Sequence, residues 1–141
     1  MKKLISFIVL ILALLTLVGC QADPQHVLSS YDQKECYYEQ GFKDYTDYCK
    51  FYYNEQSIKD YEKQSHFKKV TAENIDSLKE LIIEYNRWVK SQEYFDKYDF
   101  DYQTQIKIGD LFYWETRGED SFDLYYVDFE KCILYFFHNN I

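Results

Sequence analysis

The segment Leu111–His138 reads LFYWETRGEDSFDLYYVDFEKCILYFFH, and the short breaks between its apolar runs decide the predicted fold. Three runs in it are rich in apolar and aromatic residues: Leu111–Thr116, Phe122–Phe129 and Cys132–His138. Only Arg117–Ser121 and Glu130–Lys131 separate these runs. Runs of this length predict strands, and connections this short join antiparallel neighbours. With a further candidate strand at Gln103–Ile108, the C-terminal half is predicted to be a four-stranded antiparallel meander.

Both faces of this predicted sheet are apolar. We assign one face the side chains of Phe112, Trp114, Tyr125, Val127, Phe129, Ile133, Tyr135 and Phe137. The opposite face then carries Tyr113, Leu124, Tyr126, Leu134 and Phe136. This second face needs a cover, because large exposed apolar patches are uncommon on monomeric proteins. We expect the helix predicted around residues 38–52 to cover it as core. The alternative is that these five residues form a docking surface for a partner protein.

A strong helical pattern precedes the strands. Five apolar residues recur at steps of three and four: Ile75, Leu78, Ile82, Tyr85 and Val89. This spacing places them on one stripe of a helix, which Leu81 and Trp88 widen. The helix is predicted to begin after Thr71, whose hydroxyl can accept a bond from a free amide of the first turn. It is expected to fade between Gln92 and Phe95.

Two further helices are predicted upstream. In Glu35–Tyr53, five residues fall at helical spacing: Tyr38, Phe42, Tyr45, Cys49 and Tyr52. A shorter helix is predicted from a cap at Asn54 or Ser57 to about His66. Its inward-facing residues are expected to be Ile58 and Tyr61. The predicted class is therefore α+β, with N-terminal helices packed on a C-terminal four-stranded antiparallel β-meander.

The start of the chain has the layout of an export signal. The basic Met1–Lys3 precedes the almost entirely apolar Leu4–Val18. A membrane-spanning helix needs about 20 apolar residues, which is more than this run contains. Leu17-Val18-Gly19-Cys20 resembles the lipobox of bacterial lipoproteins, and the resemblance implies cleavage before Cys20 and attachment of lipid to its sulfur. The alternative is an ordinary secretory signal cut elsewhere, or an uncleaved anchor.

This resemblance, together with the length and the polar pattern of the rest, predicts a division of the chain into three parts. Residues 1–19 are a signal peptide, residues 20–34 hold the lipid and form a tether, and residues 35–141 form a single α+β domain at the extracytoplasmic face of the cell membrane. The formal net charge is −8, and the leader contains none of the 24 acidic residues. An acidic surface repels phosphate backbones and anionic headgroups. Nucleic acid is therefore excluded as a partner, and lipid on Cys20 has to provide the membrane anchor.

Three other cysteines, Cys36, Cys49 and Cys132, lie in the mature part. If residues 36–52 are one helix, Cys36 and Cys49 are about 20 Å apart along its axis. A disulfide needs Cα atoms within about 7 Å, so this helix would prevent a bridge, whereas a break at Gly41 would permit it. We expect buried free thiols, with a Cys36–Cys49 disulfide as the alternative.

No standard catalytic or cofactor motif is present. The chain contains no G-x-G-x-x-G, P-loop, G-x-S-x-G, C-x-x-C or H-E-x-x-H. The three histidines are isolated in sequence: His26, His66 and His138. Asp96, Asp99 and Asp101 offer three oxygen ligands, but the segment lacks the central Gly and the terminal Glu of an EF-hand loop. We favour a solvated acidic loop over a calcium site and expect no enzymatic activity, cofactor or metal.

Two segments, Phe67–Ile75 and Leu134–Ile141, are similar to segments in a group of small proteins of low-GC Gram-positive bacteria, some of them lipoproteins. This resemblance extends over roughly residues 51–141 and implies a cell envelope without an outer membrane. The group has no assigned activity and supplies no catalytic residues. We expect a membrane-anchored binding or interaction module with a protein partner. The alternatives are an immunity-type or inhibitor protein that neutralises a basic partner and, third, a cell-envelope hydrolase.

Overall fold

The computed structural model describes residues 26–38, 45–118 and 121–140. The predicted signal peptide, the lipidation site Cys20 and the possible helix break at Gly41 lie outside these residues. Within the described ranges, no helix has the length and apolar character needed to cross a membrane.

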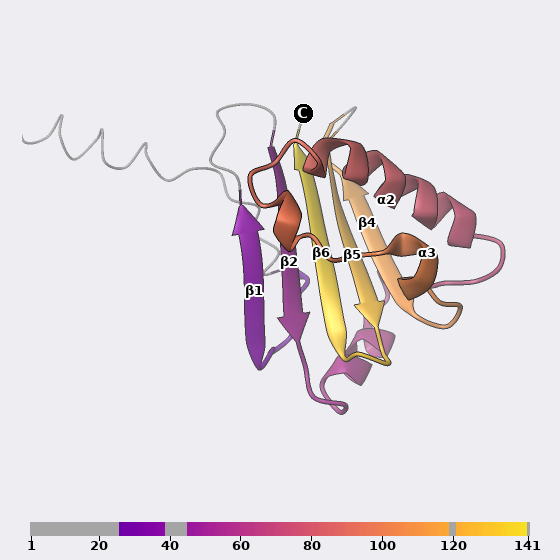
Figure 1. Cartoon of the computed structure of the whole chain (residues 1–141). Coiled ribbons are helices and arrows are strands. Elements are labelled where there is room, and N and C mark those ends of the chain that lie inside the picture. Colours follow the sequence, from indigo (N-terminus) through magenta and orange to yellow (C-terminus); the bar gives the residue numbers. More distant parts are fainter. Residues whose placement is uncertain (1–25, 39–44, 119–120, 141) are drawn as a thin grey trace, which may run out of the picture.

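Six strands form one antiparallel sheet (Figure 1). They are β1 (Gln33–Tyr38), β2 (Tyr45–Tyr52), β3 (Lys68–Lys69), β4 (Leu111–Thr116), β5 (Phe122–Asp128) and β6 (Ile133–Asn140). Their order across the sheet is β1-β2-β6-β5-β4-β3, so β6 lies inside the sheet between β2 and β5. The helical segments are η2 (Ile58–Lys63), α2 (Ile75–Val89), η3 (Phe95–Lys97) and α3 (Tyr102–Gln105).

The predicted class, with N-terminal helices packed on a four-stranded meander, is wrong. Residues 35–38 belong to β1 and residues 45–52 form β2, where the sequence predicted one helix, and α2 is the one long helix in the described part of the chain. Strand β2 pairs with β1 on one side and β6 on the other, and it is buried along nearly its whole length. A strand buried on both faces does not alternate between apolar and polar residues. Its aromatic residues therefore also matched the spacing of a helix.

The predicted strand Gln103–Ile108 is wrong as well, because its first residues belong to α3. The carboxylate of Asp101 accepts hydrogen bonds from the backbone N–H of Gln103 at 3.0 Å and from the hydroxyl of Thr104 at 2.9 Å. These bonds cap the first turn of α3. The chain then turns at Gly109, whose φ of 105° suits glycine, and enters β4.

The predictions for α2 and for the last three strands are confirmed. Four residues of the predicted stripe are buried: Leu78, Ile82, Tyr85 and Val89. The runs predicted as strands in Leu111–His138 form β4, β5 and β6. The start of α2 differs in one detail, since the side chain of Asn74 accepts the N–H of Thr71 at 2.8 Å and donates to the carbonyl of Lys69 at 2.9 Å. Asn74, and not the hydroxyl of Thr71, therefore fixes the chain before the helix.

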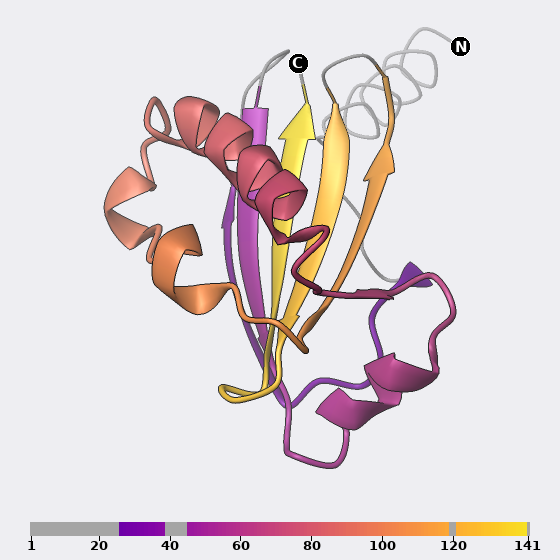
Figure 2. The same cartoon turned by 90° about the vertical axis from the view of Figure 1, so that its right-hand side faces the viewer.

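The two faces of the sheet have different covers, as Figure 2 shows with α2 on one side and η2 on the other. The stripe of α2 packs on residues of β2, β5 and β6 that include Tyr48, Tyr126 and Phe137. On the other face, Ile58, Tyr61 and Phe67 pack on residues that include Cys49, Tyr125 and Phe136. The inward position predicted for Ile58 and Tyr61 is confirmed. The cover of the second face is thus the segment after β2, and not a helix at residues 38–52.

The predicted division of side chains between the two faces is wrong for β5. Strand β4 pairs with β5 in a register that places Phe112 opposite Tyr126, so these two residues share the α2 face. The η2 face carries Tyr125, Val127, Leu134 and Phe136. The register is set at the hairpin, where the N–H of Arg117 donates to the carbonyl of Ser121 at 2.8 Å. A change of one residue in register exchanges the faces of a whole strand.

Cys36 and Cys49 lie directly opposite each other in β1 and β2 and form a disulfide, with their Cα atoms 4.1 Å apart. The expectation of free thiols at these two positions is therefore wrong, because it depended on one helix that contained both. Two paired strands bring together residues that a helix would hold apart. Cys132 is the free cysteine among the described residues.

Replacing both Cys36 and Cys49 by Ser should lower the free energy of unfolding by about 3 kcal/mol, because the bridge closes a short loop in the unfolded chain. Urea denaturation measures this difference. Thiol titration of the denatured, unreduced protein should detect Cys132 and no second thiol besides Cys20. The control Cys132→Ser should leave stability nearly unchanged, and titration of three thiols besides Cys20 would contradict the disulfide.

Candidate functional site

A groove of about 580 Å³ lies between α2 and β4 on the α2 face of the sheet. Its apolar lining consists of Leu78, Leu81, Phe112 and Trp114. Its polar rim consists of Lys68, Asn74, Ser77, Glu80 and Glu84. Leu78 and Phe112 also belong to the core, so the floor of the groove is continuous with the interior. A concave, mostly apolar surface with a few polar groups is the usual form of a binding site.

The shortness of β3 opens this groove. Strand β3 has two residues, and they pair with Phe112 and Leu111 at the start of β4. Beyond Phe112, β4 is the edge of the sheet within the described ranges. Trp114 on this edge is 40% exposed, although its ring lies on the same side of the sheet as α2. The groove is therefore bounded by a helix, an exposed indole and an open strand edge.

Lys50 of β2 is the centre of a first polar network. Its ammonium lies 2.9 Å from Asp99 and 3.1 Å from Glu35. Tyr48 donates to Asp99 at 2.7 Å, and Tyr52 donates to Glu35 at 3.0 Å. Burial alone would raise the pKa of Asp99, but the bonds from Lys50 and Tyr48 outweigh it and lower this pKa. The bonds from Lys50 and Tyr52 lower the pKa of Glu35. This network joins the loop after α2 to the first two strands.

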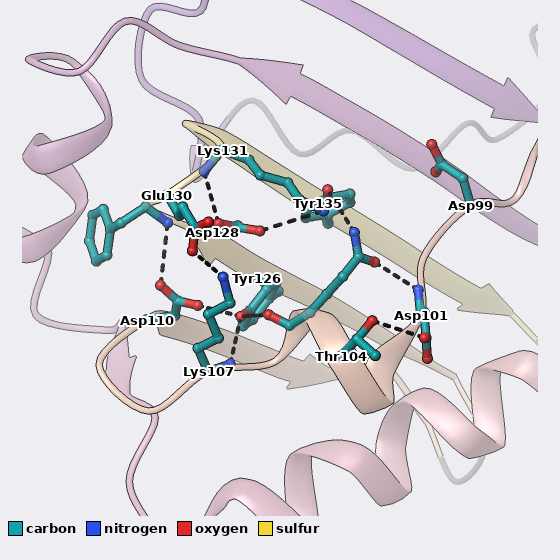
Figure 3. Close-up of polar contacts among 12 residues, drawn as sticks. Asp99, Asp101, Thr104, Lys107, Asp110, Tyr126, Asp128, Glu130, Lys131 and Tyr135 are labelled. Atoms are coloured by element: carbon teal, nitrogen blue, oxygen red, sulfur yellow. Dashed lines mark hydrogen bonds and ion pairs between the residues drawn. The ribbon is translucent and has the colours of Figure 1, made fainter.

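A second network holds the segment 101–110 against β5 and β6 (Figure 3). The hydroxyl of Tyr126 lies 2.5 Å from Asp110 and 2.9 Å from the carbonyl of Gln105, and it accepts the N–H of Lys107 at 3.1 Å. Asp110 also accepts the N–H of Phe129 at 3.3 Å. Burial raises the pKa of both Asp110 and Tyr126. The two side chains are bonded to each other and to backbone groups, so they stabilise the position of this segment on the sheet.

A third network lies at the end of the η2 face. Asp123 is fully buried and contacts His138 Nδ1 and Arg117, each at 2.5 Å. Glu115 lies 3.8 Å from Arg117 and 3.3 Å from His26. The side chain of His138 is 4% exposed, and its Nε2 has no hydrogen-bond partner among the described residues. The imidazole is thus enclosed by the sheet.

The accessibility and spacing of these titratable groups limit the chemistry that they could perform. An Asp–His pair is part of many hydrolase sites, but a general base has to reach its substrate, and His138 is enclosed. The part of the chain that the structure describes contains no cluster of three or more His, Cys, Asp or Glu side chains suited to a metal ion. The acidic loop separates its carboxylates, since Asp99 binds Lys50 and Asp101 caps α3. Asp96 is 3.6 Å from Lys97.

The five residues predicted as a possible partner surface do not lie together. The sheet places Tyr113, Leu134 and Phe136 on the η2 face and Leu124 and Tyr126 on the α2 face. Four of them are fully buried, and Tyr113 is half-buried, with its hydroxyl 2.7 Å from Glu115. That hydrogen bond, with a smaller effect of burial, raises the pKa of Tyr113 to about 12. These residues contribute to the core, and the accessible site lies beside them.

The groove itself was not predicted from the sequence. The available signal was Leu81, which widens the stripe of α2 beyond the residues that the sheet buries. Comparisons with family models, with curated proteins and with solved structures found no match.

Lys50→Met should lower the free energy of unfolding at pH 7 by about 1 to 2 kcal/mol, because two carboxylates lose a charged hydrogen-bond donor. Both carboxylates have lowered pKa values in the folded protein. Their contribution is therefore present above the unfolded values near 4 and is lost as the pH falls through the folded values. The difference between wild type and variant should shrink from pH 7 to pH 3, as measured by urea unfolding.

The matched control is Lys63→Met, which removes an exposed ion pair with Asp60. It should have no measurable effect at either pH, because exposed pairs at this spacing contribute little. An equal loss for Lys50→Met at both pH values would show that the carboxylates are not responsible.

Proposed function

We propose that this protein is a lipid-anchored, extracytoplasmic binding module without catalytic activity. The observation that carries the proposal is the groove between α2 and β4, whose floor is core and whose mouth is open along a strand edge. In the networks around Lys50, Asp110 and Asp123, the titratable side chains bond to one another or are enclosed. Binding at an exposed apolar surface is the function that this arrangement supports best.

The proposed location has support from two features. The basic start, the apolar run and the lipobox-like sequence before Cys20 have the order of a lipoprotein leader. The disulfide between Cys36 and Cys49 fits a compartment outside the cytosol, where disulfides form and persist. The acidic balance of the chain gives no electrostatic attraction to anionic lipid, so the anchor is lipid on Cys20.

The anchor keeps the domain close to the membrane. Val27 is buried in the core of the η2 face, and the N–H of Ser29 donates to the hydroxyl of Tyr61 at 3.1 Å. The predicted tether of residues 20–34 is therefore attached to the sheet from Val27 onward. The chain from Cys20 to Val27 can span at most about 25 Å, since an extended residue adds about 3.5 Å. A partner held by this domain would thus lie near the membrane surface.

Cys20→Ser should abolish incorporation of labelled palmitate and leave a chain that still begins at Met1, because the modified sulfur is required before cleavage. Wild type should carry lipid on an N-terminal Cys20. Metabolic labelling and intact-mass measurement of the membrane fraction report both changes. Cys132→Ser is the matched control and should be labelled like wild type. A Cys20→Ser chain that is cut before residue 20 and retained in the membrane would contradict lipid anchoring.

A photoreactive amino acid at position 114 tests the binding role in intact cells. We expect p-benzoylphenylalanine in place of Trp114 to give a discrete crosslinked adduct on irradiation, because this position lines the mouth of the groove. The same amino acid in place of Glu62, which lies on η2 on the other side of the sheet, is the matched control. Adducts of equal yield at both positions, or none at position 114, would contradict a binding role for the groove.

A further inference from the structure

The outer edge of β4 has backbone groups that no neighbouring strand uses. The hydrogen bond from Arg117 to Ser121 sets the alternation of the hairpin, so every second residue from Arg117 bonds toward β5. The intervening residues Trp114 and Thr116 direct their N–H and C=O groups outward, as does Phe112, which pairs with β3. Within the described ranges, no strand lies beyond Trp114 and Thr116. Figure 2 views the sheet from this side.

The edge lacks three of the features that commonly protect a strand from pairing. Natural edges are blocked by proline, by lysine or by a bulge. The segment Tyr113–Thr116 contains none of these, and it pairs with β5 without interruption. Its one charged residue, Glu115, gives such protection on the η2 face, where 30% of its side chain is exposed and its carboxylate lies 3.3 Å from His26. On the α2 face the edge instead presents the exposed indole of Trp114.

The groove lies where side chains of an added strand would fall. Successive side chains of a strand alternate between faces, so every second residue of an added segment would lie on the α2 face, beside Trp114 and Leu81. The α2 side of the rim carries two carboxylates, Glu80 and Glu84. Glu84 is 2.7 Å from Arg87, whereas Glu80 has no ion pair among the described residues. Lys68 is the single positive charge at the rim.

We propose that the outer edge of β4 binds an extended segment of a basic partner polypeptide, which adds to the sheet as a strand with apolar residues alternating with Lys or Arg. The inference rests on the proposed binding function and specifies its ligand. Main-chain bonds to Trp114 and Thr116 give the affinity, and the groove selects apolar side chains. The carboxylates of Glu80 and Glu84 and the net charge of −8 favour a basic partner.

A second copy of this chain is a poorer occupant. Pairing of two β4 edges about a two-fold axis would bring the acidic rims of both copies together, and like charges at close range oppose association. The acidic balance of the whole chain acts in the same direction. Self-association is therefore an outcome that the experiment can detect, and it would contradict the proposal.

The test selects ligands from a random octapeptide display library on the purified full-length chain in detergent micelles. The expected result is enrichment of peptides in which apolar residues alternate with Lys or Arg. The enriched consensus is then synthesised, and its affinity is measured for wild type and variants. No enrichment, or enrichment of acidic peptides, would overturn the proposal. Sedimentation that shows a dimer lost in Thr116→Pro would identify a second copy as the occupant and would also overturn it.

Two variants separate the backbone contribution from the charge contribution. Thr116→Pro removes an outward N–H and should weaken the consensus peptide about tenfold, because an edge strand tolerates proline where its N–H is unused. Glu80→Lys with Glu84→Lys should weaken it by a similar factor. The matched control, Glu55→Lys with Glu62→Lys, makes the same charge change away from the groove and should bind like wild type. Unchanged affinity in Thr116→Pro would overturn strand addition.

Amide hydrogen exchange provides a readout that does not depend on how a variant folds. In wild type, the peptide should slow exchange at Trp114 and Thr116, whereas Glu115 already bonds to β5 and should change little. Equal protection of Glu115 and Trp114, or protection confined to the η2 face, would contradict an added strand. If the peptide does not slow exchange at Trp114 and Thr116 but a crosslink forms at position 114, strand addition is refuted and the binding role is not. Loss of the crosslink would refute both.

Discussion

Strand β6 is hydrogen-bonded on both sides, and the rest of the structure depends on this double pairing. Its partner β5 precedes it in the chain by one short turn, whereas β2 comes from a segment more than 80 residues earlier. The side chains of β6 alternate between the two cores, with Tyr135 and Phe137 facing α2 and Leu134 and Phe136 facing the segment that contains η2. A strand that is apolar on both faces is stable only when both faces are covered. The chain between β2 and β6 contains the segments that cover the two faces, η2 on one side and α2 on the other.

Strand β1 is held on the sheet by a disulfide, an ion pair and hydrogen bonds more than by burial of its side chains. Strand β1 is mostly exposed or half-exposed, and its attachment to β2 includes the Cys36–Cys49 disulfide and the bonds of Glu35 to Lys50 and Tyr52. In the proposed arrangement, this strand follows directly after the membrane tether. The covalent link to β2 stabilises this strand although few of its side chains are buried.

The opposite edge of the sheet, formed by β4 and the two-residue β3, is only partly covered, and the candidate site lies there. Strand β3 covers only two residues of β4, and the side chain of Trp114 between α2 and this edge remains 40% exposed. The side chains around Lys50 and Asp110 bond to one another, and His138 beside Asp123 is enclosed, whereas the groove at the β4 edge is open. The same short strand that opens the groove also frees the backbone of β4. Apolar surface and unused main-chain groups therefore occur side by side, which is the combination that strand addition uses.

The sequence by itself determined the elements whose pattern is local. The stripe of α2 is visible because one side of that helix faces water, and β4, β5 and β6 are delimited by short polar turns. Only the tertiary structure decided that residues 35–38 and 45–52 lie in two paired strands, that Cys36 meets Cys49, and which face each residue of β5 occupies. The physical reason is that a strand or helix shows a regular apolar and polar spacing only when one of its sides faces water. Almost all of β2 is buried, so its residues show no such spacing. The groove could not be predicted from the sequence either, because α2 and the edge of β4 come together only in the folded protein.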